Sequence, residues 1–316
     1  MKATLAVAAA GLGLATGCAL AARLWWAFDL FSHFRPHYAT LAALLGAVAL
    51  ISRAYPAALV LAAIALLNAW AVRDLWPGAT AAVAAPATEG APLRVVSANV
   101  LASNPTPGKV LDFVRGSNAD LVVLVDAEGE RWHGVLAALG ELYPYRAPDG
   151  WREGAPVVLL SRWPVPVETV LHLPAAERPF VVARLAAPGV TPLVVGVHPA
   201  SPKPAKPEDS RERNYQLHHV GTTVEGVAGP VILAGDLNTS PWSPHFRDLL
   251  AETGLRDAAA GRGWLPTWPV RLGPAGIPID HVLVGGGVTV VDLKRGPDVG
   301  SDHYPLIADL RVGARP

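Results

Sequence analysis

Cysteine is almost absent from this sequence, and neither sign of charge is in excess. Cys18 is the single cysteine among 316 residues, which excludes an intrachain disulfide framework and a zinc site built on cysteines. The chain has 26 basic and 26 acidic residues; five basic and three acidic ones precede residue 91, so the remainder has 21 and 23. A basic excess, which is typical of proteins that bind nucleic-acid phosphates, is therefore missing.

Charged side chains are missing from three long stretches near the N-terminus, at residues 3–22, 36–52 and 54–72. A helix needs roughly 17–25 apolar residues to cross a bilayer. We therefore predict that residues 1–75 form a transmembrane anchor of about three helices, with the lipid bilayer as a partner. A cleavable signal peptide is the alternative for the first stretch. Three buried helices of a soluble bundle would need a polar face, which these stretches lack.

The connections between these stretches carry aromatic residues and turns. The segment 23–37 contains two tryptophans and three phenylalanines, so we expect a loop at the level of the lipid headgroups. Basic residues fall on both sides of the predicted membrane and do not decide the orientation. Three crossings place the C-terminal part opposite the N-terminus. Residues 76–92, rich in Ala, Pro and Gly, are predicted to be a flexible linker.

From residue 93 to residue 316 the pattern changes to short apolar runs that alternate with amphipathic ones. Several of the runs are apolar on both faces, as in strands at the middle of a covered sheet. We predict strands at Leu93–Val96, Leu121–Val125, Val157–Leu160, Phe180–Leu185, Leu193–Val197, Val231–Ala234 and Ile279–Val284. Helical patterns occur at Lys109–Arg115, Trp132–Leu142, Arg211–Val227 and Pro244–Thr253. This mixture indicates a layered α/β domain.

Polar residues follow directly after several of these runs. Because strand ends meet at one edge of a sheet, such side chains are candidates for a common cleft. They are Asn99, Asp126, His198, Asp236 and Asn238, and Asp302 with His303 near the C-terminus. Each motif alone has an ordinary structural explanation, an Asx-type turn or a helix cap.

Taken together, the series SANV…ADLVVLVDA…LLSRWPV…VVGVHPASP…ILAGDLNTSP…PTWP…IDHVLV…SDHYPLIADL resembles the endonuclease/exonuclease/phosphatase superfamily. The resemblance covers roughly Leu93 to Val312 in the family's order, and GDLN and SDHYP are its most specific motifs. It implies a four-layer α/β sandwich of two mixed β-sheets flanked by helices. It also implies a metal-dependent phosphoric ester hydrolase.

The resemblance assigns catalytic roles to five residues. His198 matches the histidine that contacts the scissile phosphate, and Asp236 the aspartate that orients or deprotonates the attacking water. Asn238 matches a phosphate-binding neighbour. Asp280 matches the carboxylate that pairs with the catalytic histidine, which is here His303.

Metal and substrate positions follow in the same way. Asn99, Asp126 and Asp302 match residues at the metal, for which Mg²⁺ is expected, with Mn²⁺ as the alternative. At the position of Asp126 the family normally has a glutamate, and the aspartate side chain is about 1.5 Å shorter than a glutamate side chain. Glu128 is a second candidate ligand. Tyr145 falls where an active-site tyrosine is often found.

Arginine is well shaped for bidentate phosphate binding, so Arg178, Arg162 and Arg213 are candidates for phosphate contacts. For each of them a solvated surface position is the ordinary alternative. We carry Arg178 forward as a substrate-binding residue.

Three functions remain open at this point. The first is a membrane-anchored phosphatase or phosphodiesterase that acts on a phosphorylated, lipid-linked substrate. Anchored members of the family include ones linked to glycopeptide-antibiotic resistance with an external catalytic domain, which implies an extracytoplasmic domain here. The second is a membrane-bound nuclease with nucleic acid as its substrate, and the third is a non-catalytic membrane module that kept the fold.

Overall fold

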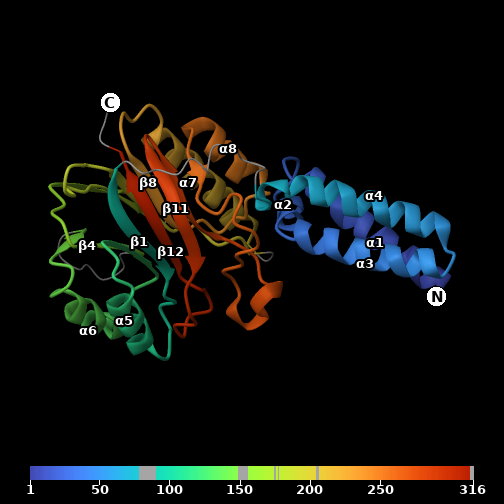
Figure 1. Cartoon of the computed structure of the whole chain (residues 1–316), viewed down its shortest axis with the longest axis horizontal. Helices are drawn as coiled ribbons and strands as arrows, with labels where there is room; N and C mark the ends of the chain where they lie inside the picture. The colour runs from blue at the N-terminus through green and yellow to red at the C-terminus, as the bar shows by residue number, and fades with distance from the viewer. Residues whose placement is uncertain (78–89, 149–155, 174–175, 177, 204–205, 314–316) are drawn as a thin grey trace.

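The computed structural model describes residues 1–77, 90–148, 156–173, 176, 178–203 and 206–313. Figure 1 shows two parts: a long helical region at the N-terminal end and a layered domain of sheets and helices. The helices of the first part are α1 (Lys2–Leu20), α2 (Trp26–Ser32), α3 (Arg35–Ile51) and α4 (Tyr55–Ala71), followed by the short 3₁₀ helix η1 (Arg73–Leu75). Helices α1, α3 and α4 lie side by side, and α2 lies at the junction with the layered domain.

The helical region is held together by small residues and exposes large apolar ones. Its interior includes Ala9, Ala42 and Ala49, which let the helices approach closely. The outward surface carries large apolar side chains, among them Val7, Leu14, Leu44, Leu59 and Leu66. A polar contact also crosses the bundle, where the Asn68 amide donates to the Thr16 hydroxyl over 3.0 Å.

The three long helices match the three predicted stretches, but they differ in their capacity to span a bilayer. Only α1 is long and apolar enough by itself among the described residues, and α2 with α3 forms a second such span if the pair, bent by 59°, counts as one. Helix α4 has 17 residues and a length of about 25 Å, somewhat short of a typical hydrocarbon core. The expectation of a loop over residues 23–37 was wrong, because this segment contains α2 and the start of α3.

The layered domain contains two six-stranded sheets. The first is built from β1 (Ala91–Asn99), β2 (Leu121–Val125), β3 (Tyr145–Ala147), β4 (Val157–Ser161), β11 (Val288–Arg295) and β12 (Leu306–Val312), in the order β11-β12-β1-β2-β4-β3. The second is built from β5 (Val167–Leu171), β6 (Phe180–Arg184), β7 (Leu193–Val197), β8 (Val231–Asp236), β9 (Arg256–Asp257) and β10 (Asp280–Gly285), in the order β5-β6-β7-β8-β10-β9. Both sheets are mixed, since β1 with β2 and β7 with β8 are parallel and the other pairs antiparallel.

The sheets pack face to face and helices cover their outer faces. Val95 and Val123 of the first sheet and Ile232 and Val282 of the second belong to the shared core between the sheets. Helices α5 (Pro107–Gly116) and α6 (Glu130–Leu139) cover the first sheet, and α7 (Pro207–Val224) and α8 (Pro244–Thr253) cover the second. The predicted four-layer sandwich is confirmed.

Local pattern located most of the inner strands well, and it missed the four edge strands and the inner strand β12. The strands β2 and β7 and the helix α8 have the predicted bounds, and the other predicted strands and helices differ by a few residues at their ends. The sequence prediction missed β3, β5, β9, β11 and β12, and it missed η2 (Val270–Ala275). Most of the predicted linker 76–92 lies outside the described residues, and β1 already begins at Ala91.

Candidate functional site

The parallel strand pairs of the two sheets end at the same edge of the sandwich, and a cavity of about 440 Å³ lies there. We call it the edge cleft. It is lined by Leu30, His33, Phe34, Asn99, Leu101, Asp126, Arg178, His198, Ser201, Pro202, Asp236, Asn238, Trp268, Ile277, Ile279, Asp302 and His303. Eight of the ten predicted site residues therefore line one cleft, and Asp280 adjoins it through His303.

The backbone explains this convergence. Asn99 and Asp236 are the last residues of β1 and β8, while Asp126 and His198 directly follow β2 and β7. Asp280 begins β10 and pairs with Asp236 in the antiparallel register, so it lies at the same edge. A side chain at Gly235 would collide with the carbonyl oxygen of Val197, so glycine permits β8 to lie this close to β7 at the cleft.

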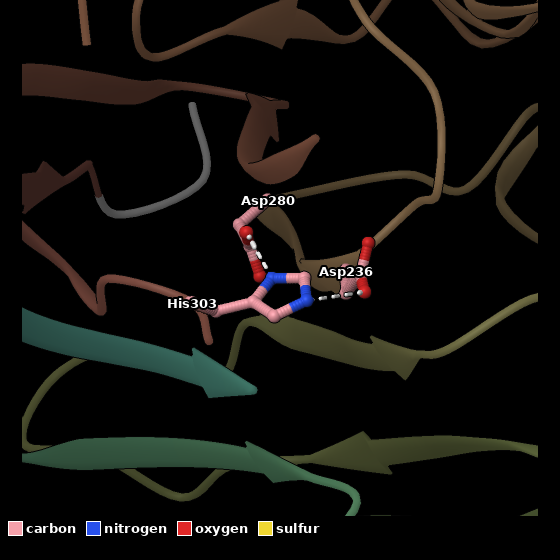
Figure 2. A group of neighbouring side chains, drawn as sticks. All are labelled: Asp236, Asp280 and His303. Atoms are coloured by element: carbon pink, nitrogen blue, oxygen red, sulfur yellow. Dashed lines mark hydrogen bonds and ion pairs between the residues drawn. The ribbon is translucent and has the colours of Figure 1, made fainter. Parts of the chain in front are cut away.

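A buried carboxylate–histidine pair lies at the cleft, with His303 in its lining and Asp280 behind His303 (Figure 2). The Nδ1–H of His303 donates to Asp280 Oδ2 over 2.8 Å, and the His303 Nε2 faces Asp236 Oδ2 at 3.7 Å. Burial would lower the pKa of His303, but the charges of Asp280 and Asp236 outweigh that effect and raise the pKa to about 9. His303 is therefore protonated at neutral pH.

Asp236 is fixed by donors on several sides. Its Oδ2 accepts a hydrogen bond from the Asn99 side-chain amide at 3.0 Å, and its Oδ1 accepts one from the Asn238 backbone N–H at 2.8 Å. His198 Nε2 lies 3.5 Å from the same Oδ2. Burial favours a higher pKa for Asp236, but His303, His198 and the Asn238 N–H together hold the pKa well below its usual range. Asp236 is an ionised carboxylate at the floor of the cleft.

Asp126 faces two cationic or potentially cationic side chains. Its Oδ1 lies 3.1 Å from Arg178 Nη1 and 3.0 Å from His198 Nδ1. Nη1 of Arg178 is itself 2.6 Å from His198 Nδ1. His198 Nδ1 can donate to Asp126 when it carries a proton or accept from Arg178 when it does not, but it cannot do both. The backbone of Asp126 has a φ of 57°, which turns the chain out of β2. Glu128, the second candidate ligand, does not line the cleft.

The donor set of the cleft fits a hard divalent cation. Asn99, Asp126, Asp236 and Asp302 all line the cavity and carry side-chain oxygens, and Mg²⁺ prefers oxygen ligands with water completing its shell. Asp236, Asp280 and His303 also lie close enough together to hold an ion. We favour the oxygen set because the Nδ1–H of His303 is tied to Asp280 and because Mg²⁺ prefers oxygen ligands to nitrogen ligands.

The helical region supplies one wall of the edge cleft, which the sequence did not lead us to expect. Leu30, His33 and Phe34, from α2 and the turn after it, line the cleft. His33 Nδ1 lies 2.8 Å from the hydroxyl of Ser240, within the loop that follows β8. The segment predicted to lie among lipid headgroups is thus part of the site.

A buried ion pair fastens this wall. Asp29 of α2 and Arg213 of α7 are both fully buried, and their Oδ2 and Nη2 atoms are 2.6 Å apart. The Nη1 of Arg213 also donates to the carbonyl oxygen of Asn238 over 3.1 Å. Arg213 therefore holds the backbone of a predicted catalytic residue and is not free to contact a phosphate. Asp29 is the only acidic residue before Asp74, and a lone charge in an apolar region was the available signal.

Two predicted positions lie away from the cleft. Tyr145 pairs with Ser161 at the start of β3, and Ser161 pairs with Leu121 at the opposite end of β2 from Asp126. Arg162 is at that same far end, 3.7 Å from Asp120. The family pattern suggested Tyr145 and the residue type suggested Arg162, and neither carries information on which end of a strand faces the site.

Comparison with known families matches residues 96–303 to the Endonuclease/Exonuclease/phosphatase family. The chain belongs to this family. Membership identifies it as a phosphoester hydrolase, and the family depends on divalent metal ions. The edge cleft lies within the matched residues apart from its α2 wall. A search of curated protein sequences gives no match.

Solved structures with the same fold include an endonuclease/exonuclease/phosphatase, a sphingomyelinase and a beta toxin. The endonuclease/exonuclease/phosphatase from Beutenbergia cavernae is 26% identical, with a TM-score of 0.56, over 70% of this chain and 72% of that one. Sphingomyelinase C from Streptomyces griseocarneus is 23% identical, with a TM-score of 0.55, over 69% of this chain and 99% of that one. A Staphylococcus aureus beta toxin variant with bound magnesium ions is 20% identical, with a TM-score of 0.51, over 69% and 99%.

Proposed function

We propose that this chain is a membrane-anchored, Mg²⁺-dependent phosphoesterase that hydrolyses a phosphate ester or pyrophosphate on a lipid-linked substrate. The observation that carries the proposal is the wall of the edge cleft formed by Leu30, His33 and Phe34 of the helical region. A phosphate in the cleft lies directly beside helices whose outer surfaces are apolar. This arrangement suits a substrate that remains in the bilayer while its headgroup is cleaved.

The exposed surface of the helical region supports a multi-pass anchor. The α1, α3 and α4 helices expose leucine and valine on the surface away from their shared core, which would be unfavourable in water over so large an area. Three crossings place the layered domain opposite the N-terminus. We assign the layered domain to the extracytoplasmic side, in line with the anchored members of the family, and labelling of a cysteine introduced on the surface of the layered domain by a membrane-impermeant reagent, in intact and in lysed cells, tests this assignment.

The residues of the cleft divide the chemistry between them. A bound Mg²⁺ (or Mn²⁺) supplies positive charge for the phosphate oxygens, and Asn99, Asp126 and Asp302 are the side chains assigned to hold it. The ionised Asp236 orients the attacking water and accepts its proton. His303, protonated and held by Asp280, donates a proton or a hydrogen bond to an oxygen of the scissile phosphate group.

Three further side chains complete the proposed phosphate site. His198 and Arg178 lie together at one side of the cleft and offer positive charge to the phosphate. The amide of Asn238 donates to the carbonyl oxygen of Pro199, so in this state its position is set by the protein. Asn238 stabilises the phosphate once its amide donates to a phosphate oxygen of the substrate in place of the Pro199 carbonyl oxygen.

Hydrolysis by the purified full-length protein in lipid nanodiscs, with Mg²⁺ or Mn²⁺, tests the proposal. A polyprenyl pyrophosphate is assayed by release of inorganic phosphate, and a plasmid and a short single-stranded DNA are assayed by strand cleavage on a gel. Asp236→Ala should abolish release, while Asp112→Ala, a change at an exposed carboxylate on α5, should leave it intact. Cleavage of nucleic acid alone, with a steep decline in salt, would instead establish the nuclease.

A further inference from the structure

A second cavity, which we call the apolar groove, lies where the helical region meets the layered domain. Its volume is about 680 Å³. It is lined by Pro36, His37, Ala39, Thr40, Leu41 and Leu44 of α3, Ala69, Val72, Leu75 and Trp76 around the end of α4, and Trp264, Pro274 and Ala275 of the layered domain. No Asp, Glu, Lys or Arg lies among these residues, so the groove suits a hydrocarbon.

The apolar groove adjoins the edge cleft across a thin partition. Phe34 and Ile277 line the cleft, and the neighbouring Pro36 and Ala275 line the groove. Between them, His37 Nε2 donates to the carbonyl oxygen of Ala275 over 3.0 Å, and the His37 ring lies 5.7 Å from that of Phe34. The chain segments 34–37 and 275–277 therefore contribute to the lining of both cavities.

The opposite side of the groove faces the apolar surface of the helices. Leu41 and Leu44 are 47% and 62% exposed, and they continue into the outward surface of α3. The Thr40 hydroxyl is turned back to the carbonyl oxygen of Pro36, which removes one polar group from the lining. A hydrocarbon chain in the groove would thus lie between the partition formed by His37 and Ala275 and the outward surface of α3, with no Asp, Glu, Lys or Arg in its lining.

We propose that the apolar groove binds the phosphate-proximal part of the hydrocarbon chain of the substrate lipid. The inference rests on the proposed function and adds a chain-binding site that is separate from the phosphate site. It predicts that recognition depends on chain length as well as on the phosphate group. Ala69 is the position for testing this, because a larger side chain there would fill the groove.

The experiment compares a long-chain phosphate with a short, water-soluble ester of the same headgroup. Ala69→Phe should lower kcat/KM for the long-chain substrate roughly tenfold, the loss expected when about two methylene groups lose their apolar contact. It should leave the short ester unchanged. Ala62→Phe serves as the matched control, because Ala62 is exposed on the same helix seven residues away, outside the groove.

Crosslinking provides a readout that does not depend on turnover. A long-chain phosphate with a photoreactive group near the head should label residues 36–44, 69–76 or 264–275, and excess unlabelled phosphate lipid should compete. Labelling confined to the outer surface of α3 and α4, or labelling without competition, would mean that bilayer lipid or a second copy covers the groove and would overturn the inference. Equal kcat/KM of Ala69→Phe and wild type on the long chain would also overturn it.

These outcomes are separate from failure of the proposed function. If wild type does not hydrolyse any lipid phosphate, the proposed function fails whatever Ala69→Phe does. If wild type hydrolyses the lipid and the groove variant is unaffected, the proposed function stands and the chain-binding site is wrong.

Discussion

The ion pair between Asp29 and Arg213 gives the sharpest test of the idea that the anchor is part of the active enzyme. Asp29→Asn keeps the shape of the side chain and removes its charge. The guanidinium of Arg213 would then be buried without a counter-charge, since both partners are only 1% exposed. Breaking such a pair from one side costs about 3–5 kcal/mol.

Asp29→Asn should also lower the rate of the catalysed reaction. Arg213 donates to the carbonyl oxygen of Asn238, so a displaced guanidinium moves the loop that follows Asp236. A displacement on the order of 1 Å in a catalytic group can lower the rate about a hundredfold. We therefore expect a lower kcat with a smaller change in KM, together with a lower midpoint of thermal unfolding in detergent.

A matched control separates this effect from general loss of charge. Arg23 and Asp248 also join the two parts of the chain, at 2.6 Å, but their side chains are 61% and 37% exposed. Arg23→Gln should cost at most about 1 kcal/mol, because exposed ion pairs contribute little. If Asp29→Asn melts where Arg23→Gln does and keeps full kcat, the reasoning is refuted.

The double variant Asp29→Leu with Arg213→Met distinguishes stability from positioning. Replacing both charges by apolar residues is often neutral for stability, so the unfolding midpoint should recover toward that of wild type. The kcat should remain low, because the Asn238 carbonyl oxygen still lacks its donor. Full recovery of both quantities would show that Arg213 has no positioning role.

Three shorter predictions follow from the cleft. Asp280→Asn should lower kcat by about 10²–10⁴-fold in a steady-state assay, because His303 loses the carboxylate that orients and charges it; an unchanged kcat would contradict the role of the pair. Gly235→Ala should reduce the yield of folded protein and its melting temperature, since the new Cβ collides with Val197; wild-type melting would argue against the close strand approach. Asp126→Glu should lower the Mg²⁺ concentration at half-maximal activity in a metal titration, because the carboxylate gains about 1.5 Å of reach; a higher midpoint would show that the pairing with Arg178 and His198 matters more.

The sequence by itself indicated a layered α/β domain, and its resemblance to the family added the four-layer sandwich and most of the residues that line the edge cleft. Buried strands such as β2 and β7 are continuous apolar runs, and the polar residue after each run lies at the strand end whatever the rest of the fold does. Parallel pairing of β1 with β2 and β7 with β8 then brings these ends together. Edge strands such as β5 lack this signal, because half of their residues face water.

Only the tertiary structure decided which parts of the chain complete the cleft. Asp29 and Arg213 are 184 residues apart, and nothing in the local pattern around either predicts their contact. Tyr145 matched a motif position, but the register of β3 places it at the far end of the sheet. Local sequence encodes periodicity and turns, whereas the docking of α2 depends on shape and charge across the whole fold. The contribution of the helical region to the wall of the edge cleft is therefore a property of the assembled chain.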